Sequence, residues 1–434
     1  MLIFSERLSV LEIRDPVHGF IKITDWERDI INHPLFQRLR RIKQLSGTDM
    51  LYPGASHTRF EHSLGVMHVA SQFFDAILSK KKNKDILISE KKFNEAGFER
   101  ERVFLRLACL LHDVGHSPYS HSGAELMPIN DGNGEKYDHE DYTVAAVRKL
   151  FKDLIDDHKA NQNYEIKADR IADFIEGSSK CGRIIFWREI LSGNLDADRC
   201  DYLLRDSHHS GVGYGKFDID RFKHTLTIAT DESHEPRIAV EEGGYHAAEG
   251  LLIARYMMFT QVYFHKTRRS YDHHIQNAIK KLLNDGYLSD KSGHFPKPDS
   301  NNNLSDYFKW DDWLVNGAIQ KGLAGTDGDI LMTRGHDRCV WYTPENPNVD
   351  DLREFKTNIK KLDSMVTFDD SYANAWYKFS YDIDIVPDDL DQPNRTVALS
   401  ELSNIIKGLK GVNQYRIYVS KEDRDKAIRL LNSE

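Results

Sequence analysis

The apolar positions in the first two thirds of the chain recur mainly at the three- to four-residue spacing of an α-helix. The segment RVFLRLACLLHDVG carries such a stripe and runs into Gly115 and then Pro118, so it predicts a helix whose last turn holds His112 and Asp113. The residues of the stripe are Val103, Leu107, Leu110, Leu111 and Val114. The same pattern predicts further helices over 34–45, 61–79, 139–151, 194–206 and 245–283.

Strand signals are fewer and lie mainly in the last third. TLTIAT (225–230) and RIAVEE (237–242), joined by DESHEP, predict a small β-hairpin. From about residue 296 the chain becomes polar and loop-like in PKPDSNNNLSD, and the residues after this segment mix strands with helices. We expect strands over 339–343, 381–386 and 415–420, and helices over 400–411 and 421–431. The chain is therefore predicted to be mainly α-helical, with a core over 1–295 and a smaller α+β region over 296–434 that serves oligomerisation or regulation.

Composition and charge narrow the class of protein. The 434 residues are 40% hydrophobic and 29% charged, which is ordinary for a soluble globular protein. A formal net charge of −9 argues against binding along a nucleic-acid backbone. No apolar run reaches the length of a membrane span, and the four cysteines are widely separated without a CxxC pair. We therefore expect a cytoplasmic protein with reduced thiols and no membrane partner.

One short segment concentrates groups that bind metals or carry protons. LLHDVGHSPYSHS, at 110–122, contains three histidines and one aspartate around a glycine and a proline. A mixed imidazole and carboxylate site suits Mn, Fe, Zn or Mg better than copper. His112 and Asp113 alone are too few to hold an ion, so further ligands must come from other segments. SHTRFEHSLGV offers two histidines and NLDADRCDYLLRDSHHSG offers four aspartates. These residues are His57, His62, Asp196, Asp198, Asp201 and Asp206.

The order of these segments resembles the HD-domain phosphohydrolase superfamily. The similarity is greatest to the deoxynucleoside-triphosphate triphosphohydrolases, the branch that includes the sterile-alpha-motif/HD-domain enzyme and bacterial dGTPases. It extends from DPVHG at 15–19 to YFHKTRRSYDH at 263–273, and the tail after 295 matches only loosely. The segments that carry it are FQRLRRIKQL, YPGASHTRFEHSLGV, LLHDVGHSPYSH, DHE, DADRCDYLLRDSHHSG and RYMMFTQVYFH. The resemblance implies an HD-domain helical core and metal-dependent hydrolysis of deoxynucleoside triphosphates (dNTPs) to deoxynucleoside and triphosphate.

The resemblance also implies which residues bind the divalent ion, whether Mn, Mg, Fe or Zn. Residue by residue, the family pattern falls on two histidines and two aspartates of this chain. They are His62, His112, Asp113 and Asp198. By the same comparison His57 is structural, and Asp196 belongs to the start of a helix.

Three further histidines match the active site of the family. Attack at the α-phosphorus makes the sugar 5′-oxygen the leaving group, and this poor alkoxide needs a proton. A histidine that titrates near neutral pH is suited to supply it. The resemblance makes His121 this general acid, while His116 and His139 hold and orient the phosphates or the acid.

The resemblance assigns substrate contacts as well. Three arginines match residues that contact the phosphates, namely Arg59, Arg199 and Arg255. Arg199 stands where the best-known relatives have a lysine, so it offers a planar fork instead of a point charge. Asp206 matches the group that binds the sugar 3′-hydroxyl, and Tyr263 matches the aromatic ring that packs on the deoxyribose. The other predicted substrate contacts are Gln44, Leu45 and Tyr202.

Some members of the family are activated by a guanine nucleotide bound between subunits, and this chain keeps only part of that regulatory site. Gln37 and Arg40 are present, but Asn32 stands where an aspartate is expected. Leu11 and Arg14 replace a lysine and an asparagine. An asparagine pairs with the guanine N1–H and amino donors less well than a carboxylate does. We therefore expect weak activation or none, in a protein that forms a homo-oligomer, either a dimer or a tetramer.

Two other functions are compatible with the sequence. One is a different nucleotide phosphohydrolase or phosphodiesterase that uses the same metal centre. The other is a nucleotide sensor or nucleic-acid-binding protein that keeps the pocket with little turnover. The full set of ligands and histidines argues against the second. The residues that match sugar and phosphate contacts favour a nucleoside triphosphate over the first, and they are Tyr202, Asp206, Arg255 and Tyr263.

Overall fold

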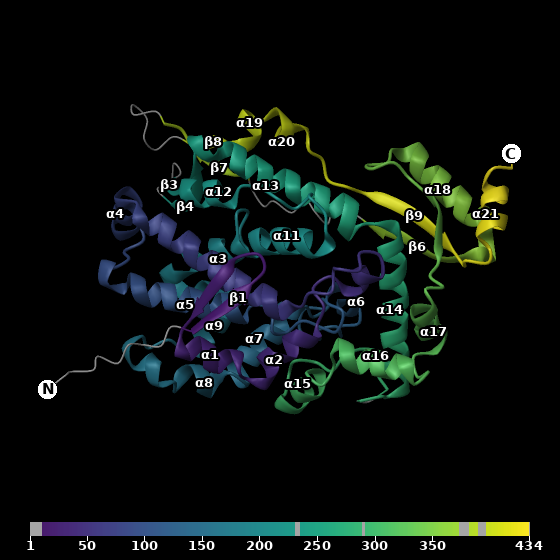
Figure 1. The fold of residues 1–434 in the computed structure, drawn as a ribbon, viewed down its shortest axis with the longest axis horizontal. Coiled ribbons are helices and arrows are strands. Elements are labelled where there is room, and N and C mark those ends of the chain that lie inside the picture. Colours follow the sequence, from purple (N-terminus) through teal and green to yellow (C-terminus); the bar gives the residue numbers. More distant parts are fainter. Residues whose placement is uncertain (1–10, 231–234, 289–290, 373–381, 389–395, 434) are drawn as a thin grey trace.

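The computed structural model describes residues 11–230, 235–288, 291–372, 382–388 and 396–433. Long helices form the body of the molecule (Figure 1). They are α3 (Arg59–Ser79), α5 (Phe98–Leu111), α7 (His139–Lys149), α11 (Ala197–Ser210), α13 (Tyr245–Met258) and α14 (Lys266–Asp285). The shorter helices around them are α1 (Asp25–Ile31), α2 (Pro34–Arg38), α4 (Lys81–Ser89), α6 (His121–Ala124), α8 (Lys152–Asp156), α9 (Ala168–Glu176), α10 (Arg188–Ser192), α12 (Ile219–Thr225), α15 (Asn301–Tyr307), α16 (Asp312–Gln320) and α17 (Gly325–Thr333). Among the helices in these ranges, none is both long and apolar enough to cross a bilayer.

Small sheets complete the fold within the described ranges. Their strands are β1 (Leu11–Asp15), β2 (Gly19–Ile23), β3 (Leu226–Thr230), β4 (Pro236–Glu241), β5 (Arg338–Tyr342), β6 (Val366–Tyr372), β7 (Asp384–Val386), β8 (Val397–Ala398) and β9 (Gln414–Val419). β1 and β2 form an antiparallel hairpin that the sequence did not predict. The predicted hairpin of β3 and β4 is confirmed, and it continues through β7, which runs parallel to β4, into β8. The third sheet has the antiparallel order β5-β9-β6.

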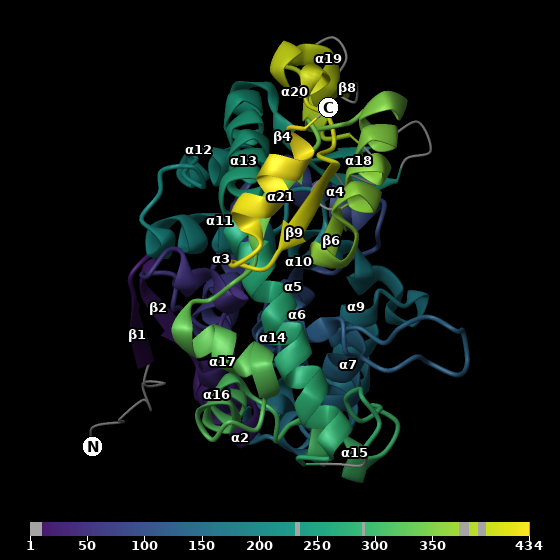
Figure 2. The same cartoon turned by 90° about the vertical axis from the view of Figure 1, so that its right-hand side faces the viewer.

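Two hydrophobic cores hold most of these elements together. The larger core runs through the helical body and includes residues from both sides of residue 295, such as Leu107, Tyr307 and Trp310. The smaller core joins the β5-β9-β6 sheet to α18 (Val349–Leu362) and α21 (Arg424–Leu431) in an α+β unit. This unit lies at the right-hand end of the molecule in Figure 1 and faces the viewer in Figure 2. The predicted fold class, a mainly α-helical core with a smaller α+β region, is therefore confirmed. The division of the chain at residue 295 stays a prediction.

Two predicted helices are shorter than their hydrophobic pattern suggested. The helix expected over 34–45 stops at Arg38, a 3₁₀ turn follows, and Ile42 is already extended. The stretch 245–283 forms two helices because a π-helical turn, Phe259–Tyr263, interrupts it and His265 caps α14. Turns of this kind are rare and often lie at functional sites, and this one contains a predicted substrate contact.

The C-terminal third also departs from its predicted pattern. The polar segment after residue 296, expected to be a loop, contains the start of α15. Ser300 caps this helix with its hydroxyl, and Leu304 and Tyr307 are buried in the larger core. The helix expected over 400–411 is split into α19 (Leu399–Leu402) and α20 (Asn404–Gly408). The strand expected over 381–386 corresponds to β7, and residue 381 lies outside the described residues.

Capping residues set the two helix starts on which the site depends. Thr58 and Glu61 form a capping box at the start of α3. Asp196 caps α11 by accepting a hydrogen bond from the Arg199 N–H, as the sequence predicted. The two helices approach closely at Gly65, where a Cβ would lie 1.8 Å from Asp201 Oδ1. Any larger residue at this position would push the helices, and the residues they carry, apart.

Candidate metal centre

The four predicted metal ligands meet at one place. His62 lies on the first turn of α3, Asp198 on the first turn of α11, and His112 and Asp113 directly follow α5. His62 Nε2 lies 3.0 Å from Asp198 Oδ1 and 3.5 Å from Asp113 Oδ2. His112 Nε2 lies 3.4 Å from Asp113 Oδ1 and 3.9 Å from Asp198 Oδ1. These side chains therefore converge as the ligands of a single ion would.

The hydrogen bonds around the two imidazoles suit metal binding. His112 Nδ1 lies 2.7 Å from the Cys109 carbonyl oxygen, so the proton sits on Nδ1 and leaves Nε2 as an acceptor. That Nε2 is buried and has no hydrogen-bond partner among the described residues. His62 Nδ1 lies 2.8 Å from Asp201 Oδ2, which likewise leaves Nε2 to face the centre. Two imidazole nitrogens and two carboxylates form a donor set for a divalent ion.

The electrostatics of the centre call for positive charge. Burial alone would lower the pKa of His62, but the carboxylates of Asp198 and Asp201 raise its pKa to about 10. Burial opposes ionisation of Asp113, yet the Arg59 guanidinium and the neighbouring imidazoles hold the pKa of this carboxyl well below its usual range. A divalent cation supplies the charge that the carboxylates attract, so the residues present fit such an ion.

A buried network behind His62 was only partly visible in the sequence. Asp201 is fully buried and accepts hydrogen bonds from His18 Nε2 at 2.6 Å and from Arg205 as well as from His62. Arg205 Nη1 also pairs with Asp15 at 2.8 Å. Outer partners of this kind fix the ring orientation and tautomer of a ligand histidine. The signal for them was the DPVHG segment at 15–19, whose chemistry the sequence left unassigned.

The three predicted catalytic histidines lie together beside the metal ligands. The rings of His116 and His139 stack with centroids 3.9 Å apart, and the His121 ring lies edge-on to His116 at 5.6 Å. His116 Nε2 lies 3.3 Å from Asp113 Oδ1. Gly115 permits this arrangement, since a Cβ there would lie 2.3 Å from the His139 carbonyl oxygen.

The surroundings of His121 lower its pKa in the free protein, whereas the sequence suggested a histidine that titrates near neutral pH. The residue is partly open to solvent. Loss of water around the ring is the larger cause of the lowered pKa, and the positive charge of Arg59 is the next. Burial and Arg59 also hold the pKa of His116 well below its usual range. An anionic ligand brought against these rings would raise both pKa values again.

The three predicted phosphate-binding arginines have different surroundings in this structure. Arg59 Nη1 pairs with Asp113 Oδ2 at 2.6 Å. Arg199, on α11, forms an ion pair with Asp196, the residue that caps the same helix. Arg255 is buried on α13, and burial lowers its pKa, with Tyr202 and Arg199 beside it.

The residues predicted to contact the sugar are divided between one hydrogen-bonded group and the nearby core. Asp206 accepts hydrogen bonds from the Tyr263 hydroxyl at 2.6 Å and from His57 Nε2 at 2.7 Å. The Tyr202 and Tyr263 rings lie 6.3 Å apart. Gln44 is buried, and its Oε1 has no hydrogen-bond partner among the described residues, while Leu45 packs in the larger core.

Gln37 and Arg40, the remaining parts of the predicted regulatory site, pair with each other. Arg40 Nε donates to Gln37 Oε1 at 2.9 Å, and Gln37 Nε2 donates to the Ile31 carbonyl at 2.7 Å. The Arg40 guanidinium also lies 3.4 Å from the ring centroid of Phe60. Both side chains are thus engaged within the chain.

Comparison with known proteins agrees with this geometry. The HD domain matches residues 59–205, and the HD associated region matches residues 217–294. The chain is 32% identical to the uncharacterized protein YwfO of Bacillus subtilis, over 77% of this chain and 72% of that protein. It is 31% identical to deoxynucleoside triphosphate triphosphohydrolase SAMHD1 of Homo sapiens, over 64% of this chain and 44% of that protein.

Two solved structures share the fold over nearly the whole chain. A hypothetical protein from Aquifex aeolicus has a TM-score of 0.77 at 28% identity and covers 98% of this chain and 100% of its own. A phosphohydrolase from Bacteroides thetaiotaomicron has a TM-score of 0.72 at 26% identity, with 95% and 100% covered. The chain belongs to the HD-domain phosphohydrolase superfamily. It spans less than half the length of the human triphosphohydrolase, so the activity of that enzyme is not carried over by similarity alone.

Proposed function

We propose that this protein hydrolyses dNTPs to deoxynucleoside and triphosphate with the help of a divalent ion. The observation that carries the proposal is the arrangement along α11. Asp198 of the metal centre, Tyr202 and Asp206 follow at four-residue intervals, so one face of this helix bears both a metal ligand and the acid that faces Tyr263. Relatives whose names give dNTP triphosphohydrolase activity support the same substrate class.

Each group of residues has a role in this proposal. His62, His112, Asp113 and Asp198 would hold the ion, which when bound polarises phosphoryl oxygens and makes water a better nucleophile. The arginines bind the phosphates as charge-assisted hydrogen-bond donors. They are Arg59, Arg199 and Arg255. Arg199 would leave its ion pair with Asp196 to bind a phosphate. Asp206 accepts a hydrogen bond from the sugar 3′-hydroxyl in place of the one from Tyr263 or His57. Tyr263 packs against the deoxyribose.

Proton transfer to the departing 5′-oxygen falls to His121 in this proposal. The ring is neutral in the free protein because its pKa is lowered. The negative charge of a bound triphosphate raises that pKa, so the proton is taken up with the substrate and is ready for the leaving group. His116 and His139, stacked beside it, orient the ring and the phosphates.

The first products decide between this reaction and its nearest alternative. The metal-loaded protein should convert each accepted dNTP to deoxynucleoside and tripolyphosphate, which ion-exchange chromatography separates from monophosphate and pyrophosphate. Monophosphate and pyrophosphate as first products would show that another bond is attacked. Hydrolysis of cyclic or monophosphate esters without dNTP turnover would support the more general phosphohydrolase function that the Bacteroides relative's name suggests.

Added GTP should activate dNTP hydrolysis weakly or not at all. Asn32 offers a carboxamide where a carboxylate would pair with both guanine donors, and Arg14 is engaged over the Phe20 ring at 4.7 Å. The measurement is the rate of hydrolysis of one dNTP at increasing GTP, with ATP as the control, alongside light scattering to follow the proposed assembly into dimers or tetramers. A strict requirement for GTP would contradict the prediction.

A further inference from the structure

The turn that precedes His121 is held in an unusual backbone conformation. Tyr119 and Ser120 have φ of 56° and 51°, and neither is glycine. Ser120 combines its positive φ with a ψ of −120°, a region that residues with a Cβ rarely occupy. Such backbone persists only where the surrounding contacts determine it. Because His121 is the next residue, the contacts that hold this turn also set the direction of its ring.

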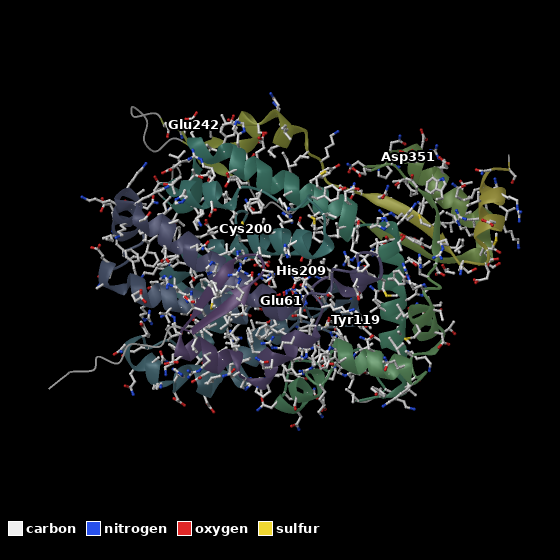
Figure 3. The ribbon with its side chains drawn as sticks, in the orientation of Figure 1. Glu61, Tyr119, Cys200, His209, Glu242 and Asp351 are labelled. Atoms are coloured by element: carbon white, nitrogen blue, oxygen red, sulfur yellow. The ribbon has the colours of Figure 1, made fainter. Side chains whose placement is uncertain are left out.

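Asp312, the first residue of α16, supplies two of these contacts. Its Oδ1 accepts a hydrogen bond from the Tyr119 N–H at 2.7 Å, and its Oδ2 accepts one from the Lys43 N–H at 2.8 Å. The Lys43 carbonyl in turn accepts a hydrogen bond from the Ser120 hydroxyl at 2.6 Å. Figure 3 labels Tyr119 in the region between α6 and α16. One carboxylate, 1% exposed, thus ties the turn to a second segment of the site.

The segment that carries Asp312 makes further bonds to the same loop. The Tyr307 hydroxyl donates to the Gly115 carbonyl at 2.7 Å. Arg38 donates both to the Trp310 carbonyl and, at 2.9 Å, to the His116 carbonyl. The loop between α5 and α6 is therefore attached to residues 307–312 directly at Gly115 and Tyr119, and through Arg38 at His116.

We propose that Asp312 is a positioning residue for His121, which it aims at the phosphates by fixing the Tyr119–Ser120 turn. The inference rests on the proposed role of His121 in hydrolysis. Asp312 lies outside both regions matched by the family, residues 59–205 and 217–294. A segment beyond the HD domain would thus complete the geometry of the HD-domain site.

Asp312→Asn is the sharpest test because it keeps the side-chain volume. The amide retains one acceptor oxygen, and its NH₂ group would face a backbone N–H that needs an acceptor. We expect kcat for a dNTP to fall by on the order of 10- to 100-fold, the size typical of a misplaced catalytic group, with metal occupancy and KM little changed. The matched control is Asp311→Asn, since Asp311 pairs with Arg41 and caps α16 through the Leu314 N–H. This control should keep the wild-type kcat.

A double-mutant cycle separates positioning of His121 from a general loss of stability. In a His121→Ala background, Asp312→Asn should lower kcat by less than about threefold, because the group that it positions is already gone. Losses that multiply in the double variant would overturn the proposal. If Asp312→Asn does not fold, Asp312→Glu replaces it in the cycle, since this change keeps the charge but moves the oxygens that accept from the Tyr119 and Lys43 N–H groups.

Amide hydrogen exchange tests the same inference without any assay of activity. Residues 117–122 should exchange faster in metal-loaded Asp312→Asn than in the wild type or in Asp311→Asn, as followed by mass spectrometry. Unchanged exchange in this loop would overturn the positioning role. If the wild type proves unable to hydrolyse dNTPs, the proposed function fails, while faster exchange would still establish that Asp312 holds the turn.

Discussion

Replacing His112 and Asp113 together by alanine should remove both the bound divalent ion and hydrolysis. The change deletes two of the four converging ligands, including the buried His112 Nε2 that has no hydrogen-bond partner among the described residues. Loss of a single outer partner of a metal ligand typically costs roughly 10–100-fold in affinity or activity, so loss of two ligands should exceed that range. Elemental analysis of the purified protein measures the first effect, and turnover of dNTP in added metal measures the second.

The control for this double variant replaces one histidine and one aspartate that lie on the surface and are not metal ligands. His246→Ala with Asp220→Ala serves, because their side chains are 74% and 79% exposed. This control should keep its metal. Circular dichroism must show that the ligand variant is folded, since removal of Asp113 leaves the buried Arg59 guanidinium without its carboxylate partner. Full metal occupancy in a folded His112→Ala/Asp113→Ala protein would reject the assignment of the metal centre.

Local sequence signals predicted the parts of the site that lie at helix ends. Asp196 was expected to start a helix and does cap α11, which places Asp198 on the first turn. Gly115 and Pro118 were expected to end a helix near His112, and α5 ends at Leu111. Helix starts and stops depend on a few neighbouring residues. For this reason the sequence placed Asp198 correctly on its helix. It placed His112 and Asp113 on the last turn of α5, and the structure has them directly after Leu111.

The sequence did not predict the hydrogen bonds between distant segments that support the site. The His18 bond to Asp201 joins residues 183 apart, and the Asp312 bond to Tyr119 joins residues 193 apart. Asp312 also follows a stretch expected to be a polar loop, whose helix is stabilised by a cap and by burial of side chains in the core. The positive φ of Ser120 had no signal, because serine does not favour that conformation and tertiary contacts impose it.

The sequence identifies metal ligands more readily than substrate contacts, and the reason is chemical. Ligand residues are restricted in type by coordination chemistry, so their identities carry information. Arginines and tyrosines have many structural uses, and the pairing of Arg199 with Asp196 is one of them. The resemblance implied Gln44 as a substrate contact, and the structure adds that its buried Oε1 lacks a hydrogen-bond partner among the described residues.

Replacing His121 by alanine should leave metal and nucleotide binding intact and lower turnover by roughly 10²–10⁴-fold. The ring is not among the four predicted ligands, and His121 is exposed to solvent. Its loss therefore removes a proton donor without removing a ligand. Elemental analysis and equilibrium binding of a dNTP separate this variant from the ligand variant, which should lose the metal itself.

The leaving group provides the decisive comparison for His121. A substrate whose 5′-bridging oxygen departs more easily needs less help from a proton donor, so His121→Ala should penalise it less than it penalises a normal dNTP. Turnover of both substrates is measured in both proteins at matched metal occupancy. An equal loss for the two substrates would exclude the acid role and leave His121 as a residue that positions phosphates. A smaller loss for the activated substrate would assign the proton to this ring, because only a group that donates to the departing oxygen is made dispensable by a better leaving group.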